Sequence, residues 1–140
     1  MSRAKAIGLL VGRAALLAAG VLSAPPAALA HHSFAMFDHV NRVTLAGTVT
    51  KFEWTNPHVY IELDVPNAKG STKHYSIECA SVNVLMRGGW KFTDVKKGDK
   101  LTLLVNPLKD GSAGGMLETA TFADGRTLGD SNPPGGVFER

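Results

Sequence analysis

Apolar and polar residues alternate along most of the segment from Val43 to Cys79, and this alternation constrains the fold more than any other feature of the sequence. A period of two places successive side chains on opposite faces of a β-strand, so each alternating run predicts a strand with one buried face. The alternating runs cover 43–54, 58–65 and 72–79, and two later strand-like runs cover 101–106 and 116–122. The sequence therefore predicts five main strands.

One short helix is expected between the third and fourth runs. Ser81 is a suitable N-cap residue, and Gly88-Gly89 ends the helical pattern. Asp124-Gly125 begins a final hairpin toward Leu128. Three meandering strands, a helix and two more strands are the order of a five-stranded Greek-key β-barrel of the OB type. An open β-sandwich built from the same strands is the alternative.

Residues 1–30 have the composition of a secretory signal peptide. They contain three basic residues, no acidic residue and a short apolar run, and they end in Ala28-Leu29-Ala30. We therefore expect cleavage after Ala30, export to the periplasm and a mature chain without a stable membrane insertion. An N-terminal membrane anchor is the alternative, but Arg13 and Pro25-Pro26 leave fewer than the roughly 20 apolar residues that a membrane span needs.

The expected mature chain is long enough for one domain. Its predicted parts are an N-terminal segment (31–42), the barrel domain (43–129) and a flexible tail (130–140) rich in Pro and Gly. Three of the fifteen Lys and Arg residues belong to the leader, so twelve basic and twelve acidic residues balance in the mature chain. A neutral surface provides no broad attraction for phosphate backbones, and we expect no nucleic-acid partner.

Six short motifs stand out in the mature chain: His31-His32-Ser33-Phe34, Gly47-Thr48-Val49, Trp54-Thr55-Asn56-Pro57-His58, Arg87-Gly88-Gly89-Trp90, Gly98-Asp99 and Asp124-Gly125-Arg126. Together they resemble an uncharacterised family of small exported bacterial proteins that is classed as a domain of unknown function. The His-His-Ser-Phe start and the Trp-x-Asn-Pro-His motif are the most specific parts. The resemblance implies export and a single small β domain, and it brings no established activity.

The expected new N-terminus could bind a metal ion. Cleavage after Ala30 frees the amino group of His31, which can chelate one ion together with the imidazole of the same residue. A further imidazole from His32, His39 or His58 completes a three-nitrogen set that suits Cu(II), and Met36 could add a thioether for Cu(I). The competing interpretation is that the two terminal histidines are a solvated remnant of cleavage.

The first hairpin is the candidate ligand site. If strand pairing continues to the Asn56-Pro57 turn, Trp54 lies near His58 and Phe52 near Tyr60, on the face opposite the core. The candidate ligand-binding residues are Trp54, Asn56, His58 and Tyr60. Such a group would lie where OB-type barrels commonly bind ligands. The alternative is a β-bulge near Lys51, which would turn both aromatic side chains into the core.

The remaining chemistry-bearing residues fit structural roles. His74 should lie opposite Asp64 on the surface, and Cys79, the only cysteine, should be buried and can form no intramolecular disulfide. No catalytic residue is assigned, because no motif orders a nucleophile, base and acid. The sequence predicts an exported, non-catalytic binding module of unknown ligand. A copper-binding protein using His31 and an envelope protein–protein interaction domain are the alternatives.

Overall fold

The structure, a computed structural model, describes residues 34–130. The predicted signal peptide, His31, His32 and residues 131–140 lie outside the described residues. The elements in chain order are η1 (Phe34–Met36), β1 (Val43–Glu53), β2 (Tyr60–Pro66), β3 (Thr72–Glu78), α2 (Val82–Arg87), β4 (Lys100–Pro107), β5 (Gly114–Phe122) and β6 (Thr127–Gly129). No helix within 34–130 is long and apolar enough to cross a membrane.

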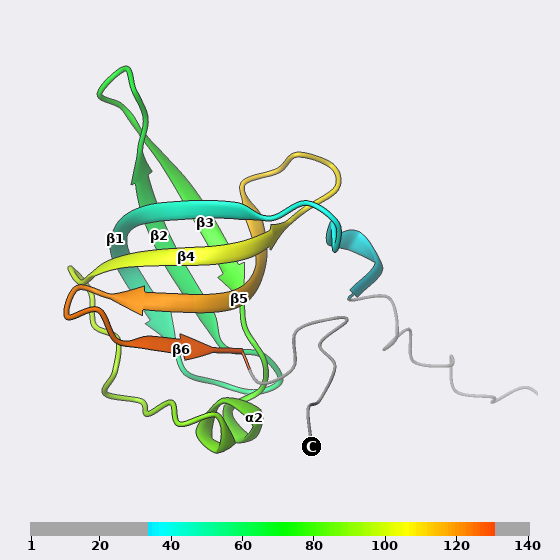
Figure 1. Ribbon diagram of the computed structural model, residues 1–140, viewed down its shortest axis with the longest axis vertical. Helices are drawn as coiled ribbons and strands as arrows, with labels where there is room; N and C mark the ends of the chain where they lie inside the picture. The colour runs from blue at the N-terminus through cyan, green and yellow to red at the C-terminus, as the bar shows by residue number, and fades with distance from the viewer. Residues whose placement is uncertain (1–33, 131–140) are drawn as a thin grey trace, which may run out of the picture. The chain divides into compact units, whose positions relative to one another are not determined.

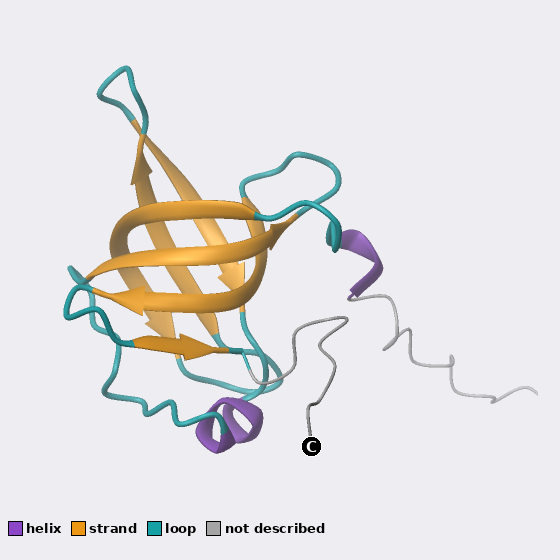
Figure 2. Cartoon of the chain, in the orientation of Figure 1, coloured by secondary structure: helices purple, strands orange, loops and turns teal. Residues whose placement is uncertain are grey.

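The strands close into a five-stranded barrel, as the sequence predicts. Antiparallel pairing gives the order β3-β2-β1-β4-β5-β6. Parallel pairing of β3 with β5 closes strands β1 to β5 into the barrel, and β6 is an additional strand beside β5. Figure 1 shows β1 and β4 crossing in front of β2 and β3, with the β2–β3 hairpin projecting beyond the barrel wall. Figure 2 shows that helix α2 lies at one end of the barrel, between β3 and β4 in the chain. The closure rules out the open sandwich.

A β-bulge in β1 decides which side chains enter the core. Pairing between β1 and β2 shifts between Val49 and Lys51, so Phe52 lies opposite the buried Ile61 and Glu53 lies opposite Tyr60. An extra residue in one strand reverses which face the following side chains occupy. Phe52 and Trp54 consequently pack against the core, with ring centroids 5.5 Å apart. The predicted placement of these two rings on the outer face is wrong, and the bulge alternative is confirmed.

The barrel interior is filled by the inward-facing residues of the alternating runs, together with side chains from the α2 region. The fully buried side chains include Ile61, Leu63, Ile77, Leu85, Leu103, Leu117 and Trp90. Cys79 is also buried, as predicted, and burial raises the pKa of its thiol well above the ordinary value. The protonated thiol is therefore a small apolar core group.

Helix α2 is capped by a residue from a distant part of the chain. Ser81 occupies the N-cap position but makes no side-chain capping hydrogen bond. The backbone N–H of Val82 donates instead to Oδ1 of Asn56, at 3.2 Å. An acceptor at this position satisfies one of the amides left unpaired at a helix start. The contact ties the β1–β2 connection to the helix, next to the candidate site.

The segment before β1 is fixed beside the loop between β4 and β5. Phe37 is buried and forms a β-bridge with Leu108. Lys109 holds η1 from the same loop, because its backbone N–H donates to the Met36 carbonyl and its Nζ donates to the Ala35 carbonyl. These contacts hold residues 34–37 against one end of the barrel.

Candidate functional site

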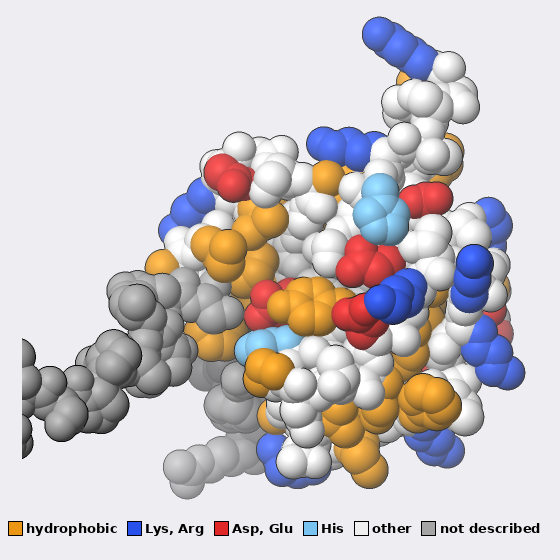
Figure 3. All heavy atoms as spheres, turned by 180° about the vertical axis from the view of Figure 1, so that it is seen from behind, with side chains coloured by type: hydrophobic (Ala, Val, Ile, Leu, Met, Phe, Trp, Pro, Cys, Tyr) orange, Lys and Arg blue, Asp and Glu red, His pale blue; other side chains and the backbone are white. Residues whose placement is uncertain are grey.

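Four carboxylates gather on the outer face of β1, β2 and β3. The cross-strand register places Tyr60 between Glu53 of β1 and Glu78 of β3. Two residues further along β2, Glu62 lies beside Ser76. We define the acidic face as Glu53, Glu62, Asp64 and Glu78. Figure 3 shows red acidic and pale blue histidine side chains clustered on this side of the molecule. Lys51 also lies on this face, where its ammonium pairs with Glu53.

His58, Tyr60 and Glu78 form one hydrogen-bonded group, which we name the Glu78 cluster. Nδ1 of His58 lies 3.2 Å from the Cys79 carbonyl oxygen and 3.1 Å from Oε1 of Glu78. The Tyr60 hydroxyl donates to Oε2 of Glu78 at 3.2 Å. Because a carbonyl oxygen and a carboxylate only accept, Nδ1 of His58 carries the proton. In this tautomer Nε2 is the ring nitrogen that can act as an acceptor or metal ligand.

Tyr60 is held as a neutral phenol. Burial, followed by the charge of Glu78 and their hydrogen bond, raises the pKa of Tyr60 to about 12. A phenol with this pKa does not ionise near neutral pH. Tyr60 therefore acts as a hydrogen-bond donor that positions the Glu78 carboxylate.

Glu78 lines two small hollows. The first, with a volume of about 170 Å³, is lined by Phe34, His58, Glu78, Cys79, Ala80, Ser81, Val84, Met116 and Asp130. We name it the His58 hollow. The second, of about 180 Å³, is lined by Met36, Tyr60 and Glu78 among others. Met36 and His58, two of the predicted metal-binding residues, thus line different hollows that share Glu78.

Asp130 belongs to the barrel, although the sequence places it at the start of the tail. Its backbone N–H donates to the Glu118 carbonyl, and its Oδ2 accepts from the backbone N–H of Ala80, both at 2.8 Å. The side chain is buried in the wall of the His58 hollow. Asp130 therefore adds a second carboxylate near His58.

His74 is clamped between two carboxylates of the neighbouring strand. Nδ1 lies 2.7 Å from Oδ1 of Asp64, and Nε2 lies 2.9 Å from Oε2 of Glu62. Ser76 donates to the other oxygen of Glu62 at 2.8 Å. The hydrogen bond to Asp64, assisted by Glu62, raises the pKa of His74. The predicted pairing of His74 with Asp64 is confirmed.

The structure separates the predicted ligand residues into two groups. His58 and Tyr60 meet at Glu78, whereas Trp54 packs against the core and Asn56 caps helix α2. The predicted stacking platform does not form. Of the predicted metal ligands, His31 and His32 lie outside the described residues, and Nε2 of His39 hydrogen-bonds to the Phe34 carbonyl oxygen at 2.8 Å. Because a carbonyl oxygen accepts, His39 is the donor.

Glu78 and Asp130 are the site residues that sequence reasoning missed. Strand register could have found Glu78, because it lies directly opposite Tyr60. Asp130 has no comparable local signal, since it reaches the site only after β6 has paired with β5. Within residues 34–130, no group of three or more His, Cys, Asp or Glu side chains is arranged to hold a metal ion.

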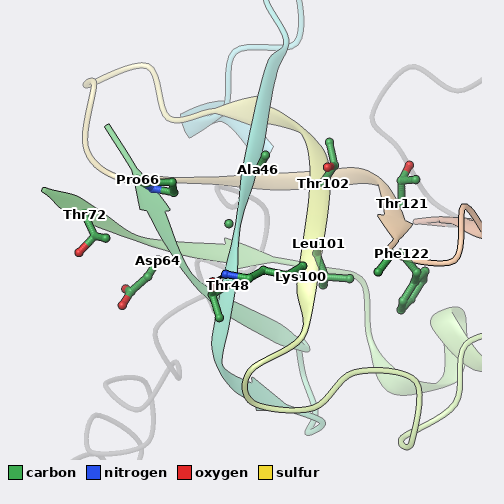
Figure 4. A pocket seen from close by; sticks show the side chains of 12 residues that line it. Ala46, Thr48, Asp64, Pro66, Thr72, Lys100, Leu101, Thr102, Thr121 and Phe122 are labelled. Atoms are coloured by element: carbon green, nitrogen blue, oxygen red, sulfur yellow. Dashed lines mark hydrogen bonds between the residues drawn. The ribbon is translucent and has the colours of Figure 1, made fainter. Parts of the chain in front are cut away.

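A larger hollow lies apart from the Glu78 cluster. It has a volume of about 550 Å³ and is formed where the β2–β3 hairpin leaves the barrel wall. Figure 4 shows Pro66 and Thr72 of this hairpin on one side and Thr102 and Thr121 of β4 and β5 on the other. We name it the threonine groove. Asp64 belongs to both its wall and the acidic face.

Comparison with known families decides the relationship of the chain. The profile described as "Family of unknown function (DUF6152)" matches residues 18–118. The chain belongs to this family. The resemblance drawn from the sequence motifs is thereby confirmed. Membership in the family carries no activity with it.

No curated protein matches the chain. Among solved structures, the barrel is similar to the mitochondrial single-stranded DNA binding protein Rim1 of S. cerevisiae. The two chains share 14% sequence identity with a TM-score of 0.43, and the match covers 59% of this chain and 94% of Rim1.

Proposed function

We propose that the protein is an exported, non-catalytic binding module that takes a cation at the His58 hollow. The observation that carries the proposal is the orientation of His58. Its Nδ1 proton is directed at the Cys79 carbonyl and at Glu78, which leaves Nε2 for a ligand. Metal-binding histidines are commonly oriented in this way, with the second ring nitrogen donating to a carbonyl or carboxylate.

The charge of the surrounding surface supports a cationic ligand. Glu78 and Asp130 line the same hollow as His58, and the acidic face continues from Glu78 along β2. Carboxylates attract cations and repel phosphate groups, so this face disfavours a nucleic-acid backbone. The leader composition supports export to the periplasm. Mass spectrometry of the protein from the cell envelope tests that part, with His31 expected as the first residue.

Zinc titration of the mature protein, followed by NMR, tests cation binding. Zn(II) should perturb the His58 ring and the backbone amides of residues 78–80, because an imidazole nitrogen is a favoured zinc ligand. His58→Gln should weaken the binding at least tenfold. Glu53→Gln is the matched control, since Glu53 shares the acidic face but does not line the hollow. Unchanged affinity in His58→Gln, or tighter binding of an oligothymidylate than of Zn(II), would contradict the proposal.

Copper binding through the mature N-terminus is the second candidate function. Phe34 lines the His58 hollow, and only two residues separate it from His31, so the chain allows His31 to lie within about 11 Å of Phe34. The amine and imidazole of His31 with Nε2 of His58 would supply three nitrogens for Cu(II). His32 is an alternative third ligand, and Met36, which lines the second hollow together with Glu78, is a candidate ligand for Cu(I).

An added residue separates the copper hypothesis from general cation binding. We expect a submicromolar Cu(II) complex in protein that begins at His31. One alanine placed before His31 should weaken it by two orders of magnitude or more, because the added residue moves the free amine away from the ring. Zn(II) binding at His58 should change much less. Equal Cu(II) affinity of the native and extended proteins would remove the terminal amine from the site.

A further inference from the structure

The threonine groove has a lining unlike that of the Glu78 cluster. Hydroxyl groups come from four strands, at Thr48, Thr72, Thr102 and Thr121. Apolar surface lies between them, chiefly from Ala46, Pro66 and Phe122. Figure 4 shows these side chains arranged around a common space, with β1 running between the two walls. The lining of the groove therefore combines hydroxyl groups with apolar surface.

The shape of the groove depends on a glycine in β1. A Cβ at Gly47 would lie 2.5 Å from the backbone oxygen of Asp64, which is closer than packed atoms approach. Gly47 thus allows the β2 backbone to lie directly against β1. Beyond this crossing, the β2–β3 hairpin continues away from the barrel and its residues form one wall of the groove. The path of the β1 and β2 backbones therefore creates the threonine groove.

The two charged groups of the groove are already paired. Asp64 accepts a hydrogen bond from His74, and Lys100 donates one to the hydroxyl of Thr48. One carboxylate and one ammonium give the lining no net charge. A strongly anionic or cationic ligand would meet a like charge on one wall, whereas a neutral ligand would meet none. The electrostatics of the groove thus differ from those of the acidic face.

Two of the hydroxyls are available to a ligand. Thr102 and Thr72 are exposed, and within residues 34–130 their hydroxyls make no hydrogen bond to the protein. Thr121 shares a hydrogen bond with Thr127 at 3.1 Å, and either hydroxyl can be the donor. A hydroxyl both donates and accepts, so it can pair with another hydroxyl in either direction. The volume lies in the range of pockets that hold small molecules.

We infer that the threonine groove binds a short, uncharged saccharide. A sugar ring presents hydroxyl groups around its rim and C–H groups on its faces, and this combination matches a neutral lining of hydroxyl and apolar patches. The site is separate from the His58 hollow, and its occupation is independent of the proposed cation binding. The saccharide lies between the β2–β3 hairpin and the outer surface of β4 and β5.

Ligand-detected and backbone-amide NMR with three neutral probes tests this inference. The probes are maltotriose, cellotriose and N,N′-diacetylchitobiose, each added to the mature protein at millimolar concentration. At least one should shift the amides of Ala46, Thr102 and Thr121 while leaving those of the His58 hollow unchanged. Thr102→Val and Thr121→Val should each weaken binding by roughly three- to tenfold, the effect of one net hydrogen bond.

Thr44→Val is the matched control. Thr44 is exposed on β1, like Ala46, but lies outside the groove, so its substitution should leave the affinity unchanged. Ala46→Trp would fill the groove and should abolish binding in a folded protein. No amide shift with any of the three probes, shifts confined to another face, or equal affinity in both groove variants and wild type would overturn the inference.

Discussion

The acidic face and the threonine groove lie on the outside of the same barrel, share Asp64, and differ in what determines them. On the acidic face, polar groups pair across strands, as Tyr60 does with Glu78 and Asp64 with His74. In the groove, the hydroxyls are neutral, and the concave shape comes from a close backbone crossing. Strand register is enough to place the contacts of the acidic face, whereas the shape of the threonine groove depends on how far the strands bend and diverge.

Gly47→Ala should have the largest effect, because Gly47 lines the groove and packs against Asp64, which belongs to both regions. Its new Cβ would collide with the Asp64 carbonyl, so β1 and β2 must move apart. Overpacking of this kind costs about 1–3 kcal/mol of unfolding free energy. Thermal and urea denaturation measure the loss. Ala46→Ser, at the exposed neighbouring position, should leave stability nearly unchanged. A Gly47→Ala protein as stable as wild type would show that the crossing is more tolerant than the contact indicates.

Glu78→Gln should have an intermediate effect that is confined to the acidic face. It removes a negative charge beside Tyr60, so the pKa of Tyr60 should fall from about 12. It should remain above 10, the ordinary value, because burial is the larger cause. The ultraviolet absorbance of tyrosinate reports the titration in a Tyr75→Phe background. Glu53→Gln should lower the pKa less, since Glu53 is the smallest of the contributors named for Tyr60. An equal fall in both variants would refute the specific role of Glu78.

Asp64→Asn should have the smallest effect on stability and should distinguish the two regions at their shared residue. The hydrogen bond that His74 donates to Asp64 is the main cause of the raised pKa of His74, so the variant should lower that pKa more than Glu62→Gln does. A raised pKa stabilises the folded state at pH values below the unfolded pKa of about 6.5, and this contribution disappears as pH rises through the folded value. An exposed pair contributes only about 0.2–1 kcal/mol.

NMR titration of the His74 ring measures this difference directly. Thr121→Val serves as the control from the groove, because Thr121 lines the groove and its hydroxyl pairs with that of Thr127. It should leave the pKa of His74 unchanged. A pKa of His74 at its ordinary value in wild type would mean that the two carboxylates do not hold the ring in solution.

The prediction of the candidate site from sequence succeeded where contacts follow from register. The alternating runs place His74 opposite Asp64, and they also place Tyr60 on the outer face. The same reasoning failed for Phe52 and Trp54, because one unpaired residue in β1 reversed their direction. A β-bulge leaves no clear mark in the alternation of apolar and polar residues, so the sequence alone does not show where it lies. Its position depends on the partner strand.

The amino-acid sequence by itself determined the β-rich fold, the order of its strands, the burial of Cys79 and the family to which the chain belongs. These properties depend on local periodicity and on short motifs. Only the tertiary structure decided that His58, Glu78 and Asp130 line one hollow and that the β2–β3 hairpin forms the wall of a groove. These arrangements join segments far apart in the chain, and barrel closure, strand bending and a single bulge set their geometry. The physical reason is that side-chain alternation specifies which face a residue occupies, while packing between distant strands specifies which residues meet.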